Sequence, residues 1–436
     1  MGDLTIEVKD DEGKPIPGAT VHLEQQSHDF WFGTALADWR LSKYKNEPAI
    51  ITKYKEVVRT HFNAAVHEDS LKWYYTERAR GSVSYRDADE WVKWCEENGI
   101  RMRGHCLFWE KEDRNLQWVR ALDRESLRQA VERRAKEVTA RYRGRIVEYD
   151  VNNEMLHGNF FRSRLGGDII GDMFRWAKEG DPNATLYVNE YLPRGYLPRY
   201  EGMIRSLLER GVPVGGIGIQ AHFGDGPGRI APPTPEEWKT VLDSLAKFGL
   251  PIKITEYSYD TPNEERKALF LADFYRLCFS HPAVEGILMW GFWEGAIWRP
   301  GAAIFDLDFS PRPAARIYRK LVYGEWWTNA TGLTDAEGRF KARAFFGRYN
   351  VTVITPDGRM AKGTFSFPRA KNASVIGIGV AKRRGESTHP PAAVATEADL
   401  ARMGGIAASA ATAIAIVAIL AIRRLRRRAA ISMRVA

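Results

Sequence analysis

The chain alternates between short apolar runs and amphipathic stretches over most of its length. Eight runs rich in β-branched and aromatic residues are each followed by a stretch of helical pattern. The clearest helical stretches, 87–98 and 123–142, each open with an aspartate suited to an N-cap. This repeat predicts an α/β fold, a (β/α)8 TIM barrel. A doubly wound open sheet is the alternative, disfavoured because no glycine-rich phosphate loop follows the first run. The runs are residues 30–36, 62–68, 101–109, 146–151, 185–190, 216–221, 252–256 and 286–291.

Two segments flanking this region have the alternating pattern of β-strands. Residues 1–27 alternate, break at Asp10-Asp11-Glu12-Gly13 and alternate again, which predicts a short β-hairpin packed on a barrel of residues 28–327. Residues 328–380 alternate around the turn Pro356-Asp357-Gly358 and predict a small antiparallel β-domain. This domain carries no distinctive carbohydrate-binding motif, so a spacer is the favoured interpretation.

The last part of the chain predicts a membrane anchor. A polar linker (381–402) precedes an uncharged stretch (403–422) that spans about 30 Å as a helix, and a basic tail (423–436) follows. The formal charge is +9, and most of the excess lies in this tail, which argues for a membrane flank and against a nucleic-acid partner. The positive-inside rule places the barrel outside the cell, although no export signal is seen at Met1. A tail-anchored protein facing the cytoplasm is the alternative.

Two glutamates stand at the ends of predicted strands. Glu154 ends Tyr149-Asp150-Val151-Asn152-Asn153-Glu154, and Glu256 ends the run 252–256. A parallel barrel keeps its catalytic groups at such strand ends. Paired carboxylates suit glycoside hydrolysis, since one protonates the leaving oxygen and the other attacks or activates water. The 14 tryptophans suit a sugar-binding cleft, and the three cysteines give no disulfide or metal-ligand spacing.

Several ordered motifs carry a resemblance across residues 4–327. In their sequence and spacing they resemble glycoside hydrolase family 10, the endo-β-1,4-xylanases. Several positions depart from the family pattern, among them Asp69, where the family usually has Asn, and Glu110, where it often has His. The motifs are Glu68-Asp69-Ser70-Leu71-Lys72-Trp73, Arg103-Gly104-His105, Asn153-Glu154, Asn189-Glu190-Tyr191, Gln220-Ala221-His222, Ile254-Thr255-Glu256, Trp290-Gly291-Phe292 and Trp298-Arg299-Pro300.

The resemblance implies a retaining mechanism without metal or cofactor. Glu154 is implied as the general acid/base and Glu256 as the nucleophile, with carboxyl groups about 5–5.5 Å apart. Nine further residues are implied to bind substrate or to orient the two glutamates. Some of these residues have a purely structural alternative. Asn153 could cap a strand end, His222 could be a core group, Lys72 could be a solvated charge, and Gln220 or Trp298 could simply pack. The nine are Glu68, Lys72, His105, Trp109, Asn153, Gln220, His222, Trp290 and Trp298.

The predicted function is that of a membrane-anchored endo-1,4-β-xylanase acting on xylan. The same machinery acting on another β-1,4-glycan is the first alternative. A catalytically inactive surface protein that binds carbohydrate is the second, and the presence of both Glu154 and Glu256 argues against it.

Overall fold

A computed structural model describes residues 1–381, and their largest part is a closed barrel of eight parallel strands. The barrel closes because β12 pairs with β3 and β11 pairs with β9. The predicted (β/α)8 barrel is therefore confirmed, and each of the eight predicted runs overlaps one barrel strand; the run 101–109 also holds the short strand β6. In barrel order the strands are β3 (Trp31–Leu36), β4 (Ala64–His67), β5 (Arg101–Gly104), β7 (Ile146–Asn153), β8 (Thr185–Glu190), β9 (Gly216–Ile219), β11 (Ile252–Asp260) and β12 (Val284–Met289).

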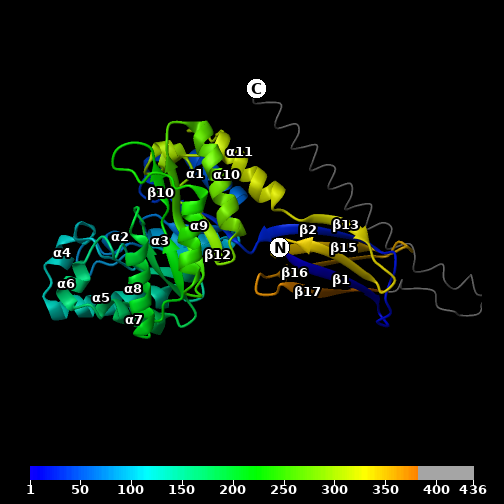
Figure 1. Cartoon of the computed structure of the whole chain (residues 1–436), viewed down its shortest axis with the longest axis horizontal. Helices are drawn as coiled ribbons and strands as arrows, with labels where there is room; N and C mark the ends of the chain where they lie inside the picture. Colours follow the sequence, from blue (N-terminus) through cyan, green and yellow to red (C-terminus); the bar gives the residue numbers. More distant parts are fainter. Residues whose placement is uncertain (382–436) are drawn as a thin grey trace, which may run out of the picture. The chain divides into compact units, whose positions relative to one another are not determined.

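A principal helix follows each barrel strand along the chain (Figure 1). The core between strands and helices is built from Ile, Val, Leu and aromatic side chains. In chain order the helices are α1 (Pro48–His61), α3 (Arg86–Glu97), α5 (Arg124–Arg141), α7 (Ile169–Gly180), α8 (Leu197–Glu209), α9 (Pro235–Ala246), α10 (Glu264–Ser280) and α11 (Pro313–Lys320).

The two predicted helix caps differ in outcome. The carboxylate of Asp123 accepts a hydrogen bond from the Ser126 amide at 2.9 Å and caps α5, as predicted. The prediction for Asp87 is wrong, since the N-cap position of α3 is Tyr85. Asp87 lies in the first turn and accepts a hydrogen bond from the Tyr75 hydroxyl at 2.7 Å. The Asp87 carboxylate, which the local pattern predicted to cap α3, therefore binds Tyr75 instead.

Short elements follow the barrel strands and carry residues toward one end of the barrel. They include β6 (Phe108–Trp109), which pairs with β7, and β10 (His222–Gly224), which pairs with β11. The 3-10 turns η2 (Glu112–Arg114), η3 (Glu294–Ala296) and η4 (Pro300–Ala302) lie in the loops after β6 and β12. Further short elements are η1 (Leu41–Tyr44), α2 (Trp73–Thr76), α4 (Gln117–Arg120), α6 (Phe160–Leu165) and the π-helical η5 (Leu321–Glu325).

The first 28 residues belong to a second, all-β part and form no hairpin on the barrel, which corrects the predicted N-terminal element. β1 (Gly2–Asp10) pairs with β14 (Arg339–Ala344) and β17 (Ala373–Val380). β2 (Thr20–His28) pairs with β13 (Asn329–Leu333) and β15 (Gly347–Ile354), and β16 (Met360–Phe367) completes that sheet. The predicted β-domain of residues 328–380 is thus completed by the start of the chain.

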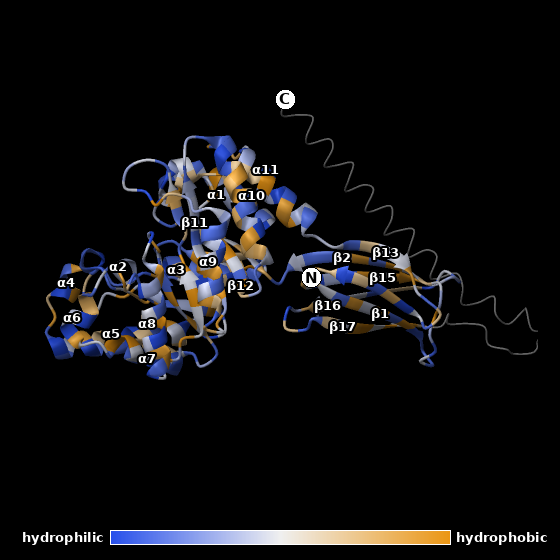
Figure 2. Ribbon diagram, viewed as in Figure 1, coloured by the Kyte–Doolittle hydropathy of each residue, from blue (hydrophilic) through white to orange (hydrophobic). Residues whose placement is uncertain are grey.

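The two small sheets enclose a common apolar core. β1 buries Leu4, Ile6 and Val8, and the other sheet contributes residues such as Leu23 and Val351. Hydrophobic and hydrophilic residues alternate along these strands in Figure 2, as expected where one face of each sheet is solvated. A lone hairpin buries too little apolar surface to be stable. This explains why β1 and β2 take partners from residues 329–380, beyond the barrel.

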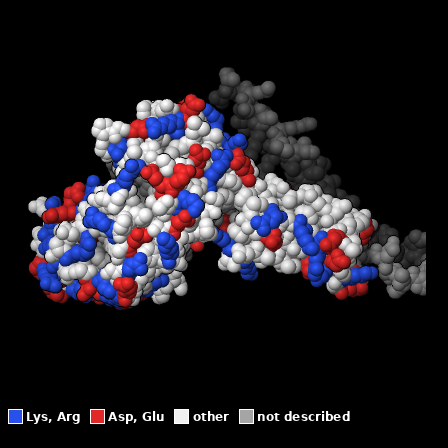
Figure 3. All heavy atoms as spheres, in the orientation of Figure 1, with Lys and Arg blue, Asp and Glu red and all other residues white. Residues whose placement is uncertain are grey.

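Charged side chains of both signs are intermingled on the face of the molecule seen in Figure 3. Some form ion pairs between neighbouring helices, such as Lys136 of α5 with Glu179 of α7 at 2.6 Å. Exposed pairs of this kind contribute about 1 kcal/mol or less each.

The predicted membrane helix (403–422) and basic tail (423–436), together with the linker beyond residue 381, lie outside the described residues. Within residues 1–381, no helix combines the length and apolar character needed to cross a bilayer.

Shortening Ile6 to alanine tests the place of β1. Ile6 is fully buried in the small β-core, so its truncation should lower the free energy of unfolding by about 2–4 kcal/mol. Native-state hydrogen exchange should accelerate at the amides of β14 and β17. Thr5→Ala, on the solvated face of the same strand, is the matched control. Unchanged exchange in β14 with faster exchange in the barrel strand β7 would contradict this domain assignment.

Candidate active site

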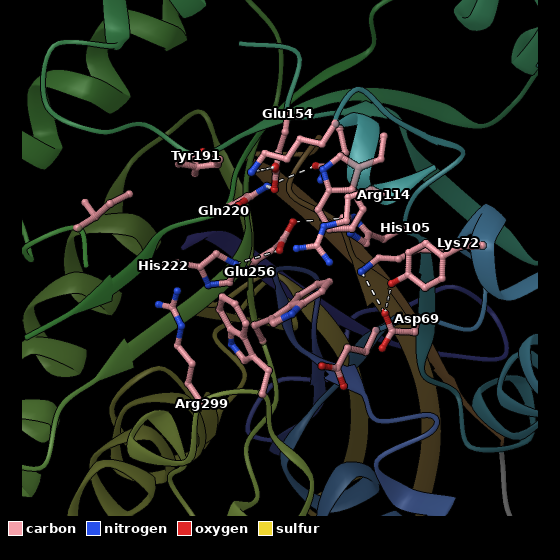
Figure 4. Close-up of a pocket in the computed structure, with 18 of the residues that line it drawn as sticks. Asp69, Lys72, His105, Arg114, Glu154, Tyr191, Gln220, His222, Glu256 and Arg299 are labelled. Atoms are coloured by element: carbon pink, nitrogen blue, oxygen red, sulfur yellow. Dashed lines mark hydrogen bonds and ion pairs between the residues drawn. The ribbon is translucent and has the colours of Figure 1, made fainter. Parts of the chain in front are cut away.

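A cavity of about 390 Å³ lies at the carboxyl ends of the barrel strands. All eleven residues predicted for the site line it: the two glutamates and the nine neighbours named above. The structure thus brings together residues that are spread over more than half of the sequence, while their roles stay predictions. Figure 4 shows several of these side chains converging on the cavity.

Glu256 lies on β11 with its carboxylate buried and fixed from two sides. Asn189 donates to Oε1 at 2.8 Å, and His222 donates to Oε2 at 3.0 Å. Nδ1 of His105 lies 3.9 Å from Oε1. Burial alone would raise the pKa of Glu256, but the charge of His105 and the hydrogen bond from His222 outweigh it and lower the pKa to about 2. Glu256 is therefore ionised at neutral and mildly acidic pH.

Glu154 follows β7 directly and has a left-handed backbone, with φ of 58°. Such a conformation is unfavourable for a non-glycine residue, by about 1–2 kcal/mol. In a regular strand, successive side chains point to opposite faces. Here the turn in the backbone lets Asn153 and Glu154 both line the cavity. The strained residue is thus the one whose side chain the site needs.

The Glu154 carboxylate has one partner on each oxygen. Gln220 donates to Oε1 at 3.1 Å, and the Lys111 ammonium lies 2.8 Å from Oε2. The contact with Lys111 is an ion pair, because Oε2 accepts no aligned hydrogen bond from the described residues. Figure 4 shows Glu154 and Gln220 side by side above Glu256.

Amide side chains connect the two glutamates. Asn189 donates to Glu256 and, at 2.9 Å, to the side-chain oxygen of Asn153. Gln220 donates to Glu154 and reaches the same Asn153 oxygen at 3.4 Å. Both carboxylates therefore belong to one hydrogen-bonded set. Asn189 is not among the predicted site residues. Its position near the carboxyl end of β8 is the sequence feature that could have indicated it.

His105 is oriented from behind the cavity. Its Nδ1 lies 2.9 Å from Oδ2 of Asp150, and Asp150 is also bound by the guanidinium of Arg103. All three side chains are buried. This contact fixes the ring orientation of His105 against Glu256.

One wall of the cavity carries paired charges. Glu68 forms an ion pair with Arg40, yet burial outweighs that contact and raises the pKa of Glu68 to about 8. The Lys72 ammonium lies 3.3 Å from Asp69 and faces the rings of Trp109 and Trp290. Arg40 is not among the residues predicted for the site, because its place there depends on an ion pair with Glu68 from another loop.

Tryptophans complete the cavity. Trp290 is buried with its ring centroid 5.0 Å from that of His105, and Trp298 lies 4.8 Å from His222. Aromatic faces of this kind stack on the apolar faces of sugars.

Glu110, which departs from the resembled motif, does not line the cavity. It is fully buried and accepts a hydrogen bond from the Phe161 amide at 2.9 Å and an ion pair from Arg162 at 3.2 Å. Its contacts fix the start of α6 beneath the loop that carries Lys111.

Two carboxylates on the carboxyl-terminal side of a parallel barrel, one just after β7 and one within β11, face a cavity walled by tryptophans. They define the site of a (β/α)8 glycoside hydrolase. Residues 22–321 match the family described as glycosyl hydrolase family 10. The chain belongs to this family.

Relatives and solved structures agree with that placement. The anti-sigma-I factor RsgI6 of Acetivibrio thermocellus is 41% identical over 84% of this chain and 46% of its own length. Endo-1,4-beta-xylanase 1 of Arabidopsis thaliana is 35% identical over 86% of this chain and 39% of its own length. Xylanase 10B of Thermotoga petrophila, solved with xylobiose, is 28% identical, with a TM-score of 0.61 over 68% of this chain and 95% of its own. The chain thus spans less than half of the length of these two curated relatives.

Replacing His222 with alanine should raise the pKa of Glu256 by about one unit or more, because the carboxylate loses a hydrogen bond that favours its charged form. A depressed carboxyl pKa stabilises the fold at higher pH, and this stability is lost as pH falls through the folded-state pKa. In the variant this contribution should therefore be smaller, and its loss should be complete at a higher pH. Carbon-13 NMR titration of labelled glutamates measures the shift. His157→Ala, which removes a partner of Glu190, is the control, and an unmoved Glu256 titration in His222→Ala would refute the assignment.

Proposed function

We propose that the chain is a retaining, endo-acting glycoside hydrolase that cleaves β-1,4-xylosidic bonds in xylan. Glu256 serves as the nucleophile and Glu154 as the general acid/base. The observation that carries the proposal is the contrast between the two carboxylates, which share one cavity but have different partners.

The surroundings of Glu256 suit a nucleophile. Its pKa of about 2 keeps it ionised, and Asn189 and His222 hold one oxygen each. An ionised carboxylate with fixed orientation is what attack on an anomeric carbon needs.

Glu154 suits proton transfer. It lines the cavity, with Gln220 on one oxygen and the partly exposed ammonium of Lys111 on the other. A departing sugar oxygen can replace that ammonium. Proton donation by a positioned acid accelerates bond cleavage by about 10²–10⁴-fold.

The reaction follows in two steps. A Glu256 oxygen bonds to the anomeric carbon as the glycosidic C–O bond breaks, and Glu154 transfers its proton to the departing oxygen. A water molecule then loses a proton to Glu154 and bonds to the anomeric carbon, which releases Glu256. Two inversions at one carbon retain the anomeric configuration.

The choice of xylan rests on family membership and on relatives. Several relatives are named endo-1,4-beta-xylanases, and one solved relative holds xylobiose. Another β-1,4-glycan is the first alternative substrate, and binding without cleavage is the second alternative.

Replacing Glu256 with glutamine should abolish hydrolysis of xylan, because a neutral amide cannot form the glycosyl-enzyme. Proton NMR should show β-anomeric oligosaccharides released early by the unaltered chain. Early release of α-anomers would contradict the retaining mechanism. No cleavage of any β-1,4-glycan, with binding retained, would favour the carbohydrate-binding alternative.

Glu154→Gln should discriminate between leaving groups. On xylan, turnover should fall by about 10²–10⁴-fold. An aryl β-xylobioside with an acidic phenol should form the glycosyl-enzyme almost normally, because that leaving group departs without a proton. Asp113→Asn, an exposed carboxylate outside the cavity wall, is the matched control.

We also propose that residues 403–422 anchor the chain in a membrane, with the arginines after them on the cytoplasmic side and the barrel outside. Support comes from the uncharged stretch and the basic residues that follow it.

Carbonate extraction of membranes tests this anchor. The full chain should stay with the membrane pellet, while Ala413→Arg, at the middle of the stretch, should shift it toward the soluble fraction, since a charge at the bilayer centre is unfavourable by about 2.5–3.5 kcal/mol. A full chain extracted by carbonate would refute the anchor, and a protease-protected barrel would refute the orientation.

A further inference from the structure

The cavity wall carries more cationic than acidic side chains. Each acidic side chain in the wall already has a cationic or histidine partner within the cavity. The pairs are Glu68 with Arg40, Asp69 with Lys72, Glu154 with Lys111 and Glu256 with His222.

Two arginines of the wall, Arg114 and Arg299, remain outside these pairs. The ion pair of Arg114 is with Asp113, its chain neighbour, at 3.4 Å, and both side chains are about half exposed or more. Among residues 1–381, no carboxylate oxygen lies within 4 Å of the Arg299 guanidinium. Nearby Asp260 is already paired with Arg229 at 2.8 Å. Both arginines therefore keep their donor groups available.

Each of the two arginines lies over a tryptophan ring. The Arg114 guanidinium lies 5.1 Å from the ring centroid of Trp109, and that of Arg299 lies 3.9 Å from Trp298. A guanidinium supported on an aromatic ring keeps its N–H edge free, and that edge matches a carboxylate with two parallel hydrogen bonds.

The arginines come from separate loops. Arg114 ends η2, after β6, and Arg299 immediately precedes η4, after β12. Figure 4 shows them on either side of Glu256 in that view. Burial and the charge of Arg229 lower the pKa of Arg299, as expected for a cation that lacks a counterion.

Arginines on a protein surface with no buried partner are often only solvated charges. Here both line the proposed sugar-binding cavity, and both lie on tryptophans predicted to bind substrate. A linear chain of xylose units carries no charge and gives these guanidinium groups no ionic partner. A uronic acid attached to the chain carries a carboxylate beside the sugar ring.

We propose that Arg114 and Arg299 bind the carboxylates of uronic acid side groups, so that the site selects acidic, uronic-acid-substituted xylan over neutral xylan. This inference rests on the proposed function, because it assigns a substrate class to the same cavity.

The test compares two matched ligands on the full chain. One is a xylo-oligosaccharide with a single uronic acid side group, and the other is the same compound after reduction of its carboxyl to an alcohol. Calorimetry on the Glu256→Gln chain measures both dissociation constants without cleavage. The acidic ligand should bind about tenfold or more tightly, as expected for a charge-assisted bidentate contact, and this preference should weaken as salt rises.

Variants assign the preference to residues. Arg114→Gln and Arg299→Gln, each with Glu256→Gln, should each reduce the ratio of the two constants severalfold, and the double replacement should bring it close to one. Arg114→Lys and Arg299→Lys should restore part of it, since charge remains but the bidentate contact is lost. Arg120→Gln is the control, an exposed arginine of α4 outside the cavity wall.

Each outcome decides between the proposals. Equal binding of the two ligands, or a preference that survives both glutamine replacements, overturns the inference and leaves the proposed function standing. A preference that depends on both arginines, in a chain whose Glu256 form cleaves neither ligand, upholds the inference and overturns the hydrolase. Binding of neither ligand overturns both.

Discussion

A continuous set of buried charges inside the barrel supports the active site. Glu148 on β7 is held between Arg103 on β5 and Lys253 on β11, and Arg103 also binds Asp150. Burial would raise the pKa of Glu148, but Lys253 and Arg103 outweigh it and lower the pKa. Removing one member of such a set leaves an unpaired buried charge, which typically destabilises a protein by 3–5 kcal/mol.

This set ends at the catalytic side of the barrel. Asp150 orients His105, and the charge of His105 is one of the factors that keep Glu256 ionised. The barrel interior therefore does more than fill space, because the charge state proposed for the nucleophile depends on residues that lie below the cavity. Different strands contribute these residues, so the closure of the barrel is what brings them into contact.

Local pattern was sufficient for the barrel and for the residues at its strand ends. β-branched residues mark strands such as β7 and β11. Glu154 follows β7 directly, and Glu256 lies within β11, which continues to Asp260. Contacts between loops that are distant in the sequence could not be predicted from local pattern. Arg40 and Lys111 contribute to the site through their ion pairs with Glu68 and Glu154. The partners of β1 are likewise invisible locally, since Gly2 lies opposite Ala344. Alternation indicates that a strand has a buried face but not which strand covers it.

The small β-part consists of two stretches of chain separated by the whole barrel. β1 and β2 are made before the barrel, whereas β14 and β17, the partners of β1, are made after it. At a synthesis rate of about 5–20 residues per second, β1 and β2 therefore remain with unpaired edges for tens of seconds while the barrel is made. Unpaired apolar strands are sites of misassembly. The barrel is in effect an insertion between the strands of another domain, and the last strands to emerge are those that protect the first.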